Sequence, residues 1–401
     1  MNEKYLIINA GSSSLKFSLY KMPEESEIVN GYVEKIGLED SFWSIKANGD
    51  KITDTCNIPS HTEAVKIMLD ILIKYNFMSS LNEIKGVGHR VLHGGEKYSK
   101  SVIITPKILN DIIELTKLGP LHHPGEISGI KAMQEVLPTV PQIAVFDTAF
   151  HQTMPEHNYL YAVPYEWYQK HGVRKYGFHG TSHKYLTGVM QQKLNKESIN
   201  LIICHVGSGA SISCIKDGKC YDTTMGLTPL DGLVMGTRCG NIDPSIIKYI
   251  MEETNYNIAE IDNILNKQSG LLGICGKSDF RDVVALKNDG NELAILAYTK
   301  YKNTIIKYIA EYYFKLQGQV DAIVFTAGVL ENNAKLREDI VNDISPVISS
   351  YINKEINDNL GYGHDLKEGL ITTSNSKLPI YVIPTNEEIM ILRDTYHIIN
   401  C

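Results

Sequence analysis

Two arginines set among glycines are the side chains best suited to chemistry in this chain. Arg90 lies in the stretch GHRVLHGG at 88–95, and Arg238 lies in GTR at 236–238. An arginine keeps its charge and forms paired hydrogen bonds with carboxylate or phosphoryl oxygens. A lone arginine is usually a surface residue, but the glycine-rich setting of these two favours a site. We expect both to bind an anion that carries carboxylate or phosphoryl oxygens.

Two turns rich in glycine and serine offer a second part of the same chemistry. Residues 5–20 (YLIINAGSSSLKFSLY) and residues 201–215 (LIICHVGSGASISCI) each read as an apolar strand, a turn of small residues and a second strand. Such turns expose consecutive backbone N–H groups that can hold phosphate oxygens. One alone would be an ordinary hairpin. Two with matching flanks, in the two halves of the chain, predict a duplicated nucleotide-binding domain with a cleft between the copies.

The elements that must position these residues alternate between strand and helix. Asp147 directly follows an apolar stretch, IAVF at 143–146, and a carboxylate at a strand end often lies in the ligand crevice of an α/β protein. Apolar spacing and caps predict further helices and strands. The expected helices are 61–77 after a Ser60 cap, 291–315 and 387–399, and the expected strands are 322–325 and 378–383. The pattern predicts mixed α/β domains.

Length and composition narrow the class of protein. With 401 residues the chain favours two domains, and 43% hydrophobic and 21% charged residues are globular proportions. A formal net charge of -7 argues against a nucleic-acid or membrane-surface partner, because both need a basic face. No signal peptide and no apolar run near the roughly 20 residues of a membrane span are expected. The seven cysteines contain no CxxC pair and read as reduced thiols, so we expect a cytoplasmic protein.

Two stretches resemble known motifs and are rejected. Residues 270–278 (GLLGICGKS) are close to a P-loop, but five residues separate Gly270 from the Gly-Lys-Ser where the motif has four. His179 and His183 are spaced like the zinc ligands of a metalloprotease, but the glutamate of that motif is missing. Neither stretch is therefore expected to form its namesake site.

A series of motifs along the whole chain resembles the acetate kinase family. In order they are NAGSSSLK at 9–16, GHRVLHGG at 88–95, GPLHHP at 119–124, FDTAFH at 146–151, YGFHGTSH at 176–183, MGLTPL at 225–230, GTR at 236–238, SDFR at 278–281, FTAG at 325–328 and TNEE at 385–388. The resemblance implies an α/β fold of two duplicated actin-like ATPase (ribonuclease H-like) domains with an interdomain cleft. It also implies a homodimer.

The same resemblance sets the expected domains. Residues 1–149 with 386–401 would form the N-terminal domain, which carries the acyl and phosphate side and is closed by the C-terminal helix. Residues 150–385 would form the C-terminal domain, which binds the nucleotide and makes the dimer contacts.

The resemblance also assigns catalytic roles to Arg90, Asp147, His179 and Arg238. Arg90 would orient the carboxylate of acetate, and His179 would hydrogen-bond the phosphoryl group in transfer, although a histidine in a glycine-rich loop can equally be structural. Asp147 is not expected to act as a base, because acetate is already ionised. Orienting an arginine, or positioning Mg²⁺ through water, suits it better.

Three groups of binding residues follow from the resemblance. The acyl pocket would comprise Leu92, Leu121, His122, Phe178 and Pro229, together with Arg90. ATP or ADP would contact Lys16, His205, Val206, Gly207, Ser208, Gly209, Asp279, Phe280, Arg281, Gly328, Val329, Leu330, Glu331 and Asn332. The ligands of Mg²⁺, or alternatively Mn²⁺, would be Asn9 and Glu387. Glu387 can also be read as a carboxylate favoured by the dipole of the helix that it begins.

Four positions depart from the family pattern. Ser208 stands where the phosphate loop usually has Asn, and Asn241 where Asp is usual. Leu330 replaces a Gly in the adenosine loop, which adds bulk and removes backbone freedom. GTP or another donor therefore stays open. Leu92 replaces a Val in the acyl pocket and favours acetate over longer acids.

The expected function is that of an acetate kinase. Acetate would attack the γ-phosphoryl group of ATP in line, giving acetyl phosphate and ADP reversibly, with Mg²⁺ bound and without a phosphoenzyme. One alternative is a propionate or butyrate kinase with the same fold. Another, of a different class, is a non-metabolic actin-like protein that uses ATP as a conformational switch.

Overall fold

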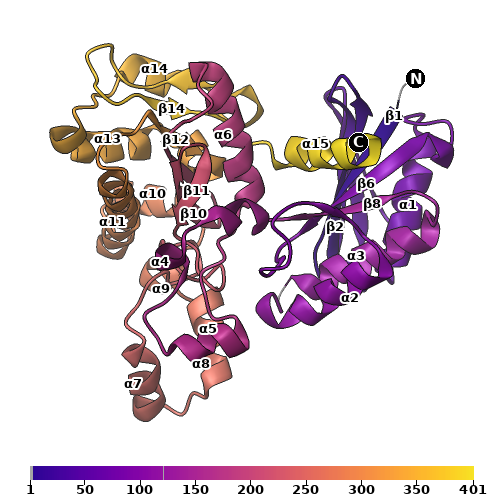
Figure 1. Cartoon of the computed structure of the whole chain (residues 1–401), viewed down its shortest axis with the longest axis horizontal. Coiled ribbons are helices and arrows are strands. Elements are labelled where there is room, and N and C mark those ends of the chain that lie inside the picture. The colour runs from indigo at the N-terminus through magenta and orange to yellow at the C-terminus, as the bar shows by residue number, and fades with distance from the viewer. Residues whose placement is uncertain (1–2, 121) are drawn as a thin grey trace. The chain divides into compact units, whose positions relative to one another are not determined.

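The computed structural model of the chain describes residues 3–120 and 122–401, apart from the side chain of His364. It divides into two units. Unit 1 comprises Met1–Gln152 and Asn386–Cys401, and unit 2 comprises Thr153–Thr385. In Figure 1 the indigo and purple segments and the yellow helix α15 belong to unit 1, and the magenta, orange and golden segments belong to unit 2.

An eight-stranded sheet forms the centre of unit 1, in the order β5-β4-β3-β2-β1-β6-β8-β7. Its strands are β1 (Glu3–Ala10), β2 (Ser14–Met22), β3 (Ser26–Glu34), β4 (Phe42–Ala47), β5 (Asp50–Thr55), β6 (Ile84–Val91), β7 (Val102–Ile103) and β8 (Gln142–Phe146). The pairs β1–β6 and β6–β8 are parallel, whereas the other neighbours are antiparallel. The carboxyl ends of β1, β6 and β8 therefore meet at one edge of the sheet.

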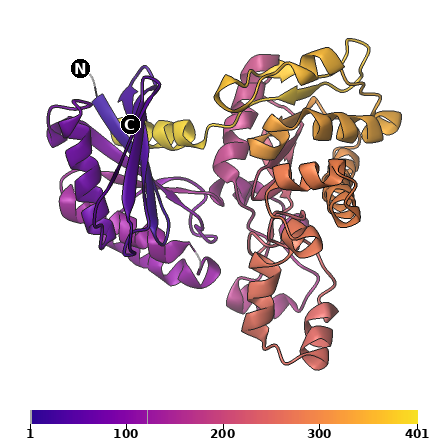
Figure 2. The ribbon, with the colours of Figure 1, turned by 180° about the vertical axis from the view of Figure 1, so that it is seen from behind.

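Helices pack on both faces of this sheet. They are α1 (His61–Lys74), α2 (Pro106–Glu114), α3 (His123–Val136) and α15 (Glu387–Asn400), with short 3-10 turns at Leu81–Glu83, Leu115–Leu118 and Ala149–Thr153. On one face, α3 packs against β1, β6 and α1, over a core that includes Leu6, Ile8 and Leu15. On the other face, α15 packs on β1, β6 and β8 (Figures 1 and 2).

The close approach of α15 depends on glycine in β6. A methyl group at Gly88 would lie 2.3 Å from Thr395 Oγ1, and one at Gly86 would lie 2.2 Å from Ile399 Cδ1. Any larger residue would push the helix off the sheet. Because Ile391 also packs on Gly88, the helix starts at the carboxyl edge of the sheet and runs antiparallel to β6.

Unit 2 repeats the strand order of unit 1. Its six-stranded sheet has the order β11-β10-β9-β12-β14-β13, which matches β3-β2-β1-β6-β8-β7. The strands are β9 (Leu201–Val206), β10 (Ala210–Lys216), β11 (Lys219–Thr223), β12 (Ala322–Thr326), β13 (Gly369–Leu370) and β14 (Ile380–Val382). The pairs β9–β12 and β12–β14 are parallel, and the remaining pairs are antiparallel. This shared topology confirms the duplication that the two hairpins predicted.

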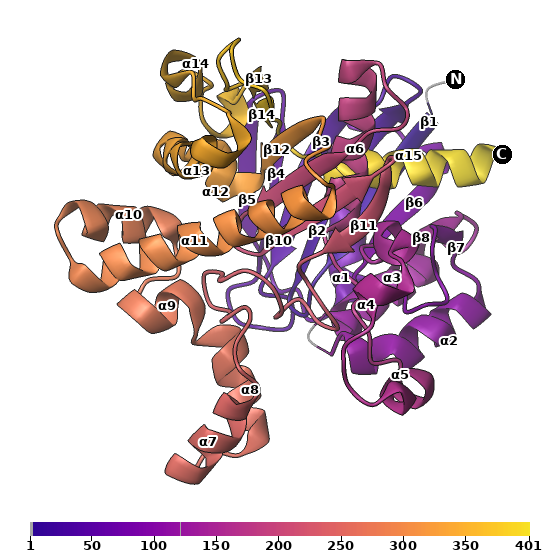
Figure 3. The ribbon, with the colours of Figure 1, turned by 60° about the vertical axis from the view of Figure 1, so that its left-hand side comes forward.

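The helices of unit 2 include α6 and α12, which contact β9, and α11, which crosses β9 and β10 (Figure 3). Helices α7 and α8 pack against each other beyond the sheet. The helices are α4 (Glu156–Tyr159), α5 (Tyr165–His171), α6 (Gly180–Leu194), α7 (Ser245–Glu253), α8 (Ile258–Lys267), α9 (Gly270–Cys275), α10 (Phe280–Asn288), α11 (Glu292–Lys315), α12 (Ala327–Asn332), α13 (Ala334–Ile348) and α14 (Lys354–Asp358), with a 3-10 turn at Gly363–Asp365.

The predicted helices and strands are all present, with small shifts at their ends. The Ser60 side chain accepts the Glu63 N–H at 3.2 Å and begins α1, as predicted, but this helix ends at Lys74. The strand expected at 378–383 is shorter, because β14 covers only Ile380–Val382. Residues 270–275 form helix α9 rather than a phosphate-binding loop. Among the described residues, no helix is long and apolar enough to cross a membrane.

Candidate active site

The carboxyl edge of the unit 1 sheet gathers several of the predicted site residues. Arg90 is the last residue but one of β6, and Asp147 directly follows β8. Arg90 pairs with Val145 across the strands, so Arg90 and Asp147 project from the same face. Gly88, two residues before Arg90, lies under α15. The arginine and the aspartate therefore lie on the face that α15 covers, near the start of that helix.

Arg90 and Asp147 form a two-pronged ion pair. Arg90 Nη2 lies 2.5 Å from Asp147 Oδ2, and Nε donates to Oδ1 at 3.3 Å. The Asp147 carboxylate is fully buried, while 19% of the Arg90 side chain is exposed. Burial opposes the charge of Arg90, but Asp147, Glu387 and Glu126 more than offset it and raise the arginine pKa. The guanidinium is thus held in one orientation by a partner that solvent does not reach.

Glu387 is the first residue of α15 and lies close enough to interact with this pair. Burial raises the pKa of its carboxyl to about 7, an effect that Arg90 partly offsets and Asp147 reinforces. Its Oε1 atom is buried and has no hydrogen-bond partner among the described residues. A buried oxygen without a partner is costly unless a ligand satisfies it. Asn386 caps the helix instead, accepting the Ile389 N–H at 3.0 Å.

These oxygens fit a hard divalent cation. Asn9 pairs with Lys16 at the end of β1, and it projects to the α15 face because its neighbour Ala10 packs on Gly129 of α3. Mg²⁺ commonly binds one or two protein oxygens and completes its shell with water and phosphate oxygens. Among the described residues, no group of three or more His, Cys, Asp or Glu side chains could hold a metal alone. A cation held by Glu387 and Asn9 would therefore take its remaining ligands from water or from a bound phosphate.

Glu126 on α3 is a buried carboxyl group near this site that the sequence analysis missed. Only 3% of the residue is exposed, and its two carboxyl oxygens accept the Leu92 N–H at 3.1 and 3.2 Å. Burial raises the pKa of Glu126 to about 8, and the charge of Arg90 partly offsets this rise. The carboxyl thereby fixes the backbone two residues after Arg90. The only signal in the sequence was its place in a helix between Gly125 and Gly129.

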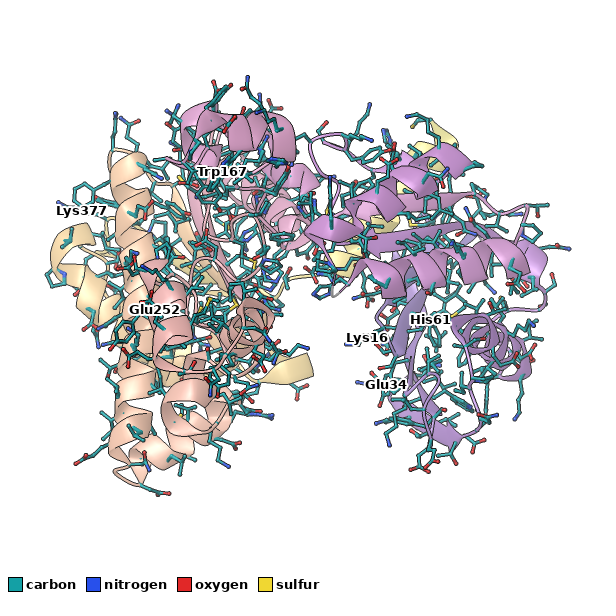
Figure 4. All side chains as sticks on the ribbon, turned by 90° about the horizontal axis from the view of Figure 1, so that it is seen from below. Lys16, Glu34, His61, Trp167, Glu252 and Lys377 are labelled. Carbon is teal, nitrogen blue, oxygen red and sulfur yellow. The ribbon has the colours of Figure 1, made fainter. Side chains whose placement is uncertain are left out.

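The turn between β1 and β2 is held by contacts with α1 and α3. The Gly11 N–H donates to Ser14 O at 2.8 Å, and His61 Nε2 lies 2.8 Å from Gly11 O. A methyl group at Gly125 would lie 2.3 Å from the carbonyl carbon of Gly11, so α3 packs directly on the turn. Lys16 follows the turn on β2 with an exposed side chain (Figure 4). The turn is thus held by its neighbours, and the exposed Lys16 side chain lies just after it.

The second turn, between β9 and β10, brings together predicted residues of unit 2. A methyl group at Gly209 would lie 3.5 Å from Arg238 Nη1 and 3.5 Å from His179 Nε2, so both side chains border this glycine. One at Gly207 would lie 3.7 Å from the Gly328 nitrogen. Ser208, at the tip of the turn, is exposed. This turn of small residues is therefore bordered by Arg238, by His179 and by Gly328, which begins the predicted nucleotide loop.

His179 is fixed by its backbone and by its neighbours. It has a left-handed φ of 56° where α6 begins, and its Nδ1 lies 2.9 Å from Ser211 Oγ. The ring stacks on His205 with centroids 4.2 Å apart. The other ring nitrogen, Nε2, is the one that borders Gly209. His183 contacts the same serine, at 2.8 Å, so the two histidines share a hydroxyl.

Among the described residues, Arg238 has no acidic partner. Its Nη1 makes long contacts only, to Pro229 O at 3.4 Å and to Met235 Sδ at 3.5 Å. Burial lowers its pKa, and within the described part of the chain no carboxylate counteracts this. A partly buried arginine that lacks a counter-ion is suited to receive an anion.

The predicted nucleotide loop coincides with helix α12. Ala327 has a left-handed φ of 66°, which turns the chain sharply after β12. Glu331 Oε1 accepts the Ala327 N–H at 2.7 Å and the Thr326 hydroxyl at 3.0 Å, so this side chain binds its own loop. Leu330 is fully buried, and its bulk therefore fills the core beneath the loop.

Other predicted contacts lie on the same side of unit 2. A methyl group at Gly236 would lie 2.8 Å from Ser278 O, which brings the segment with Arg238 next to the start of α10. Asp279 caps α10 and accepts a hydrogen bond from Arg281 Nη2 at 2.6 Å, while Phe280 is buried. Asn241 accepts the Gly232 N–H at 2.6 Å and donates to the Tyr308 hydroxyl at 2.8 Å. Asn241 is thus held by hydrogen bonds within unit 2.

The candidates for the acyl pocket are divided between the units. Leu92 and Phe178 are almost fully buried, in unit 1 and unit 2 respectively. His122 and Pro229 are half-buried. Leu121 lies outside the described residues. The four predicted catalytic residues are divided in the same way, with Arg90 and Asp147 in unit 1 and His179 and Arg238 in unit 2.

Comparison with known proteins places the chain among small-acid kinases. A model of the Acetokinase family matches residues 4–393. The chain is 50% identical over 400 residues to an acetate kinase from Bacillus cytotoxicus, covering 99% of each. It resembles the crystal structure of an acetate kinase from Porphyromonas gingivalis, with 42% identity, a TM-score of 0.93 and coverage of 99% of this chain and 100% of the other. A propionate kinase structure from Francisella tularensis gives 42% identity and a TM-score of 0.92, covering 98% and 99%. The expected two-domain, actin-like α/β fold is confirmed.

Proposed function

The chain belongs to the acetokinase family, and from this premise we propose that it transfers the γ-phosphoryl group of ATP to acetate, reversibly and with Mg²⁺. The family consists of phosphotransferases with a carboxyl group as acceptor. One observation carries the proposal. Arg238, a half-buried arginine with no carboxylate partner in the described chain, borders Gly209 together with His179. These groups suit an anion whose charge grows during the reaction.

In unit 2, the proposal assigns binding of the phosphate chain to the His205–Gly209 turn and to Gly328. Backbone N–H groups of a small-residue turn hold phosphate oxygens without blocking them. Arg238 would neutralise the equatorial oxygens of the phosphoryl group in transfer, and His179 Nε2 would hydrogen-bond one of them. The shared contact of His179 with Ser211 would keep that nitrogen aimed at Gly209.

In unit 1, the proposal assigns the acceptor to Arg90. Its free surface would hold the carboxylate of acetate, while Asp147 fixes the guanidinium by its two-pronged contact. Asp147 is already committed to Arg90, and acetate has no proton to lose. We therefore assign Asp147 the role of orienting Arg90 rather than that of a base.

We propose Glu387 and Asn9 as the protein ligands of Mg²⁺. Within the described residues, Oε1 of Glu387 has no hydrogen-bond partner and no larger cluster of metal-binding side chains is present, which supports an ion that also uses phosphate oxygens. When bound, Mg²⁺ would neutralise the phosphates of the nucleotide and align the γ-phosphoryl group. Mn²⁺ has similar ligand preferences and is expected to substitute.

We propose acetate as the acid substrate. Propionate is the alternative, because the chain is also similar to a propionate kinase. Leu92, buried next to the Arg90 strand, supports the smaller acid. One methylene is worth only about 1–3 kcal/mol, so the preference should be modest.

The remaining assignments are also proposals. Residues 1–149 with 386–401 would serve the acyl side, and residues 150–385 the nucleotide and the contacts of a homodimer. All seven cysteines are free, which supports a reducing, cytoplasmic location.

A hydroxamate assay for acyl phosphates tests the proposal. The purified chain is incubated with Mg²⁺, a donor (ATP, GTP or pyrophosphate) and acetate, propionate or butyrate, and reactions without acid serve as controls. We expect acetyl phosphate from ATP and the highest kcat/KM for acetate. A tenfold preference for propionate would replace the proposed acid, and no product with any acid would reject the function itself.

A further inference from the structure

Arg337 is the largest fully buried side chain among the described residues, and the proposed reaction does not use it. It lies on α13 with 1% of its surface exposed. Burial lowers the pKa of its guanidinium to about 10, which leaves it charged at neutral pH. No carboxylate in the described chain forms an ion pair with it. A buried charge of this kind is costly, because it leaves water without a counter-ion.

Backbone carbonyls and one amide side chain satisfy this arginine instead. Nη1 donates to Leu330 O and to Glu331 O, both at 2.7 Å. Nε donates to Asn357 Oδ1 and Nη2 to Asn357 O, both at 2.8 Å. Asn357, on α14, is itself 1% exposed and donates to Ala334 O at 2.9 Å. The guanidinium is thus fixed between α12 and α14.

The two carbonyls belong to the last turn of α12, whose carbonyls lack partners within the helix. A cation at this end is favourable because it also opposes the negative end of the helix dipole. The other end of α12 is held by the Glu331 carboxylate, which accepts the Ala327 and Thr385 N–H groups at 2.7 and 3.2 Å. Side chains therefore hold both ends of this six-residue helix.

The amino end of this helix carries Gly328, whose nitrogen lies next to Gly207 of the β9–β10 turn. Asn332 at the other end donates to Gly328 O at 2.8 Å and accepts the Gly363 N–H at 2.7 Å. A shift at the carboxyl end of α12 would thus move Gly328 relative to the turn. An apolar side chain at 337 would avoid the cost of a buried charge, but it would leave the carbonyls of Leu330 and Glu331 unfixed.

We propose that Arg337 is a positioning residue for the nucleotide: it fixes the carboxyl end of α12 and so holds Gly328 against the phosphate-binding turn, without touching the substrate. The inference rests on the proposed function, because it takes residues 328–332 to hold ATP. It predicts that Arg337 affects nucleotide binding and leaves acetate binding unchanged.

The test compares variants of the full chain. Arg337→Met keeps length but removes every donor. Asn357→Ala keeps the arginine and removes one of its acceptors. Lys335→Met is the matched control, because Lys335 lies on the same helix with a 62% exposed side chain that pairs with Asp339. Calorimetry with ADP and Mg²⁺, without acetate, gives the nucleotide Kd. Steady-state kinetics give separate KM values for ATP and acetate, and thermal unfolding gives Tm.

We expect Arg337→Met to raise the ADP Kd and the ATP KM about ten- to a hundredfold, with the acetate KM changed less than about twofold. Asn357→Ala should shift the same constants by less, and Lys335→Met should leave them unchanged. An ATP KM that stays at the wild-type value in folded Arg337→Met would overturn the inference, as would an equal rise in both KM values. If Arg337→Met does not fold, unchanged ADP affinity in Asn357→Ala overturns it. Wild-type protein that binds no ADP would instead refute the proposed function.

Discussion

The buried carboxyl of Glu126 should make the stability of unit 1 depend on pH. Its pKa rises from 4.5 to about 8 because burial disfavours the charged form. Between these values the folded protein holds a proton on Glu126 that the unfolded chain has lost. Stability contributed by this group therefore falls as pH rises from 4.5 and is lowest above pH 8.

The shift sets the size of the effect. One pKa unit corresponds to about 1.4 kcal/mol, so the whole window represents about 5 kcal/mol, and the part from pH 5.5 to 8 represents about 3 kcal/mol. Glu126→Gln removes this titration and keeps a side-chain oxygen that can accept the Leu92 N–H. The stability of the variant relative to wild type should thus increase by about 3 kcal/mol between pH 5.5 and 8.

Urea unfolding at a series of pH values measures this difference. Trp43 in the core of unit 1 is 5% exposed, and the other tryptophan, Trp167, lies in unit 2. A Trp167→Phe background therefore makes fluorescence report on unit 1. Glu135→Gln, an exposed position on the same helix, is the matched control. A stability difference between Glu126→Gln and wild type that is the same at both pH values would refute the reasoning.

Three further substitutions test the assigned roles. Arg238→Ala should lower kcat about 10²- to 10³-fold. The Tm of this variant should not fall, because the change removes a half-buried charge that has no carboxylate partner in the described chain. A wild-type kcat would exclude the catalytic role of Arg238. Asp147→Asn leaves Arg90 with a neutral partner. It should therefore raise the KM for acetate and lower the free energy of unfolding of unit 1 by about 3–5 kcal/mol, measured in urea. An unchanged KM for acetate would contradict the orienting role of Asp147. Glu387→Gln should raise the Mg²⁺ concentration needed for half-maximal rate about tenfold or more, and an unchanged Mg²⁺ titration would remove Glu387 as a ligand.

The sequence predicted those parts of the fold that local patterns encode. The hairpins β1–β2 and β9–β10 follow from apolar runs broken by small residues, and α1 follows from its Ser60 cap. Residues 26–55, which form β3 to β5, carried no prediction. Strand β5 is exposed along most of its length, so its residues lack the alternation that marks a half-buried strand.

The candidate site was predicted less completely, because its geometry depends on contacts between distant segments. Glu126 and Arg337 carried no prediction, and only the folded chain shows that each is buried and hydrogen-bonded to backbone groups. Leu330, which was expected to add bulk to the nucleotide loop, has a fully buried side chain, and its position depends on packing that the local sequence does not encode. The adjacency of His179 and Arg238 at Gly209 likewise arises from segments far apart in the sequence.

Running the reaction backwards tests the proposed chemistry most directly. The purified chain is mixed with acetyl phosphate, ADP and Mg²⁺, and newly formed ATP is read by luciferase luminescence, with EDTA and Arg238→Ala as controls. We predict steady ATP synthesis by the wild type that chelation abolishes and the arginine variant nearly loses. Folded wild-type protein that yields no ATP from acetyl phosphate would contradict the assignment.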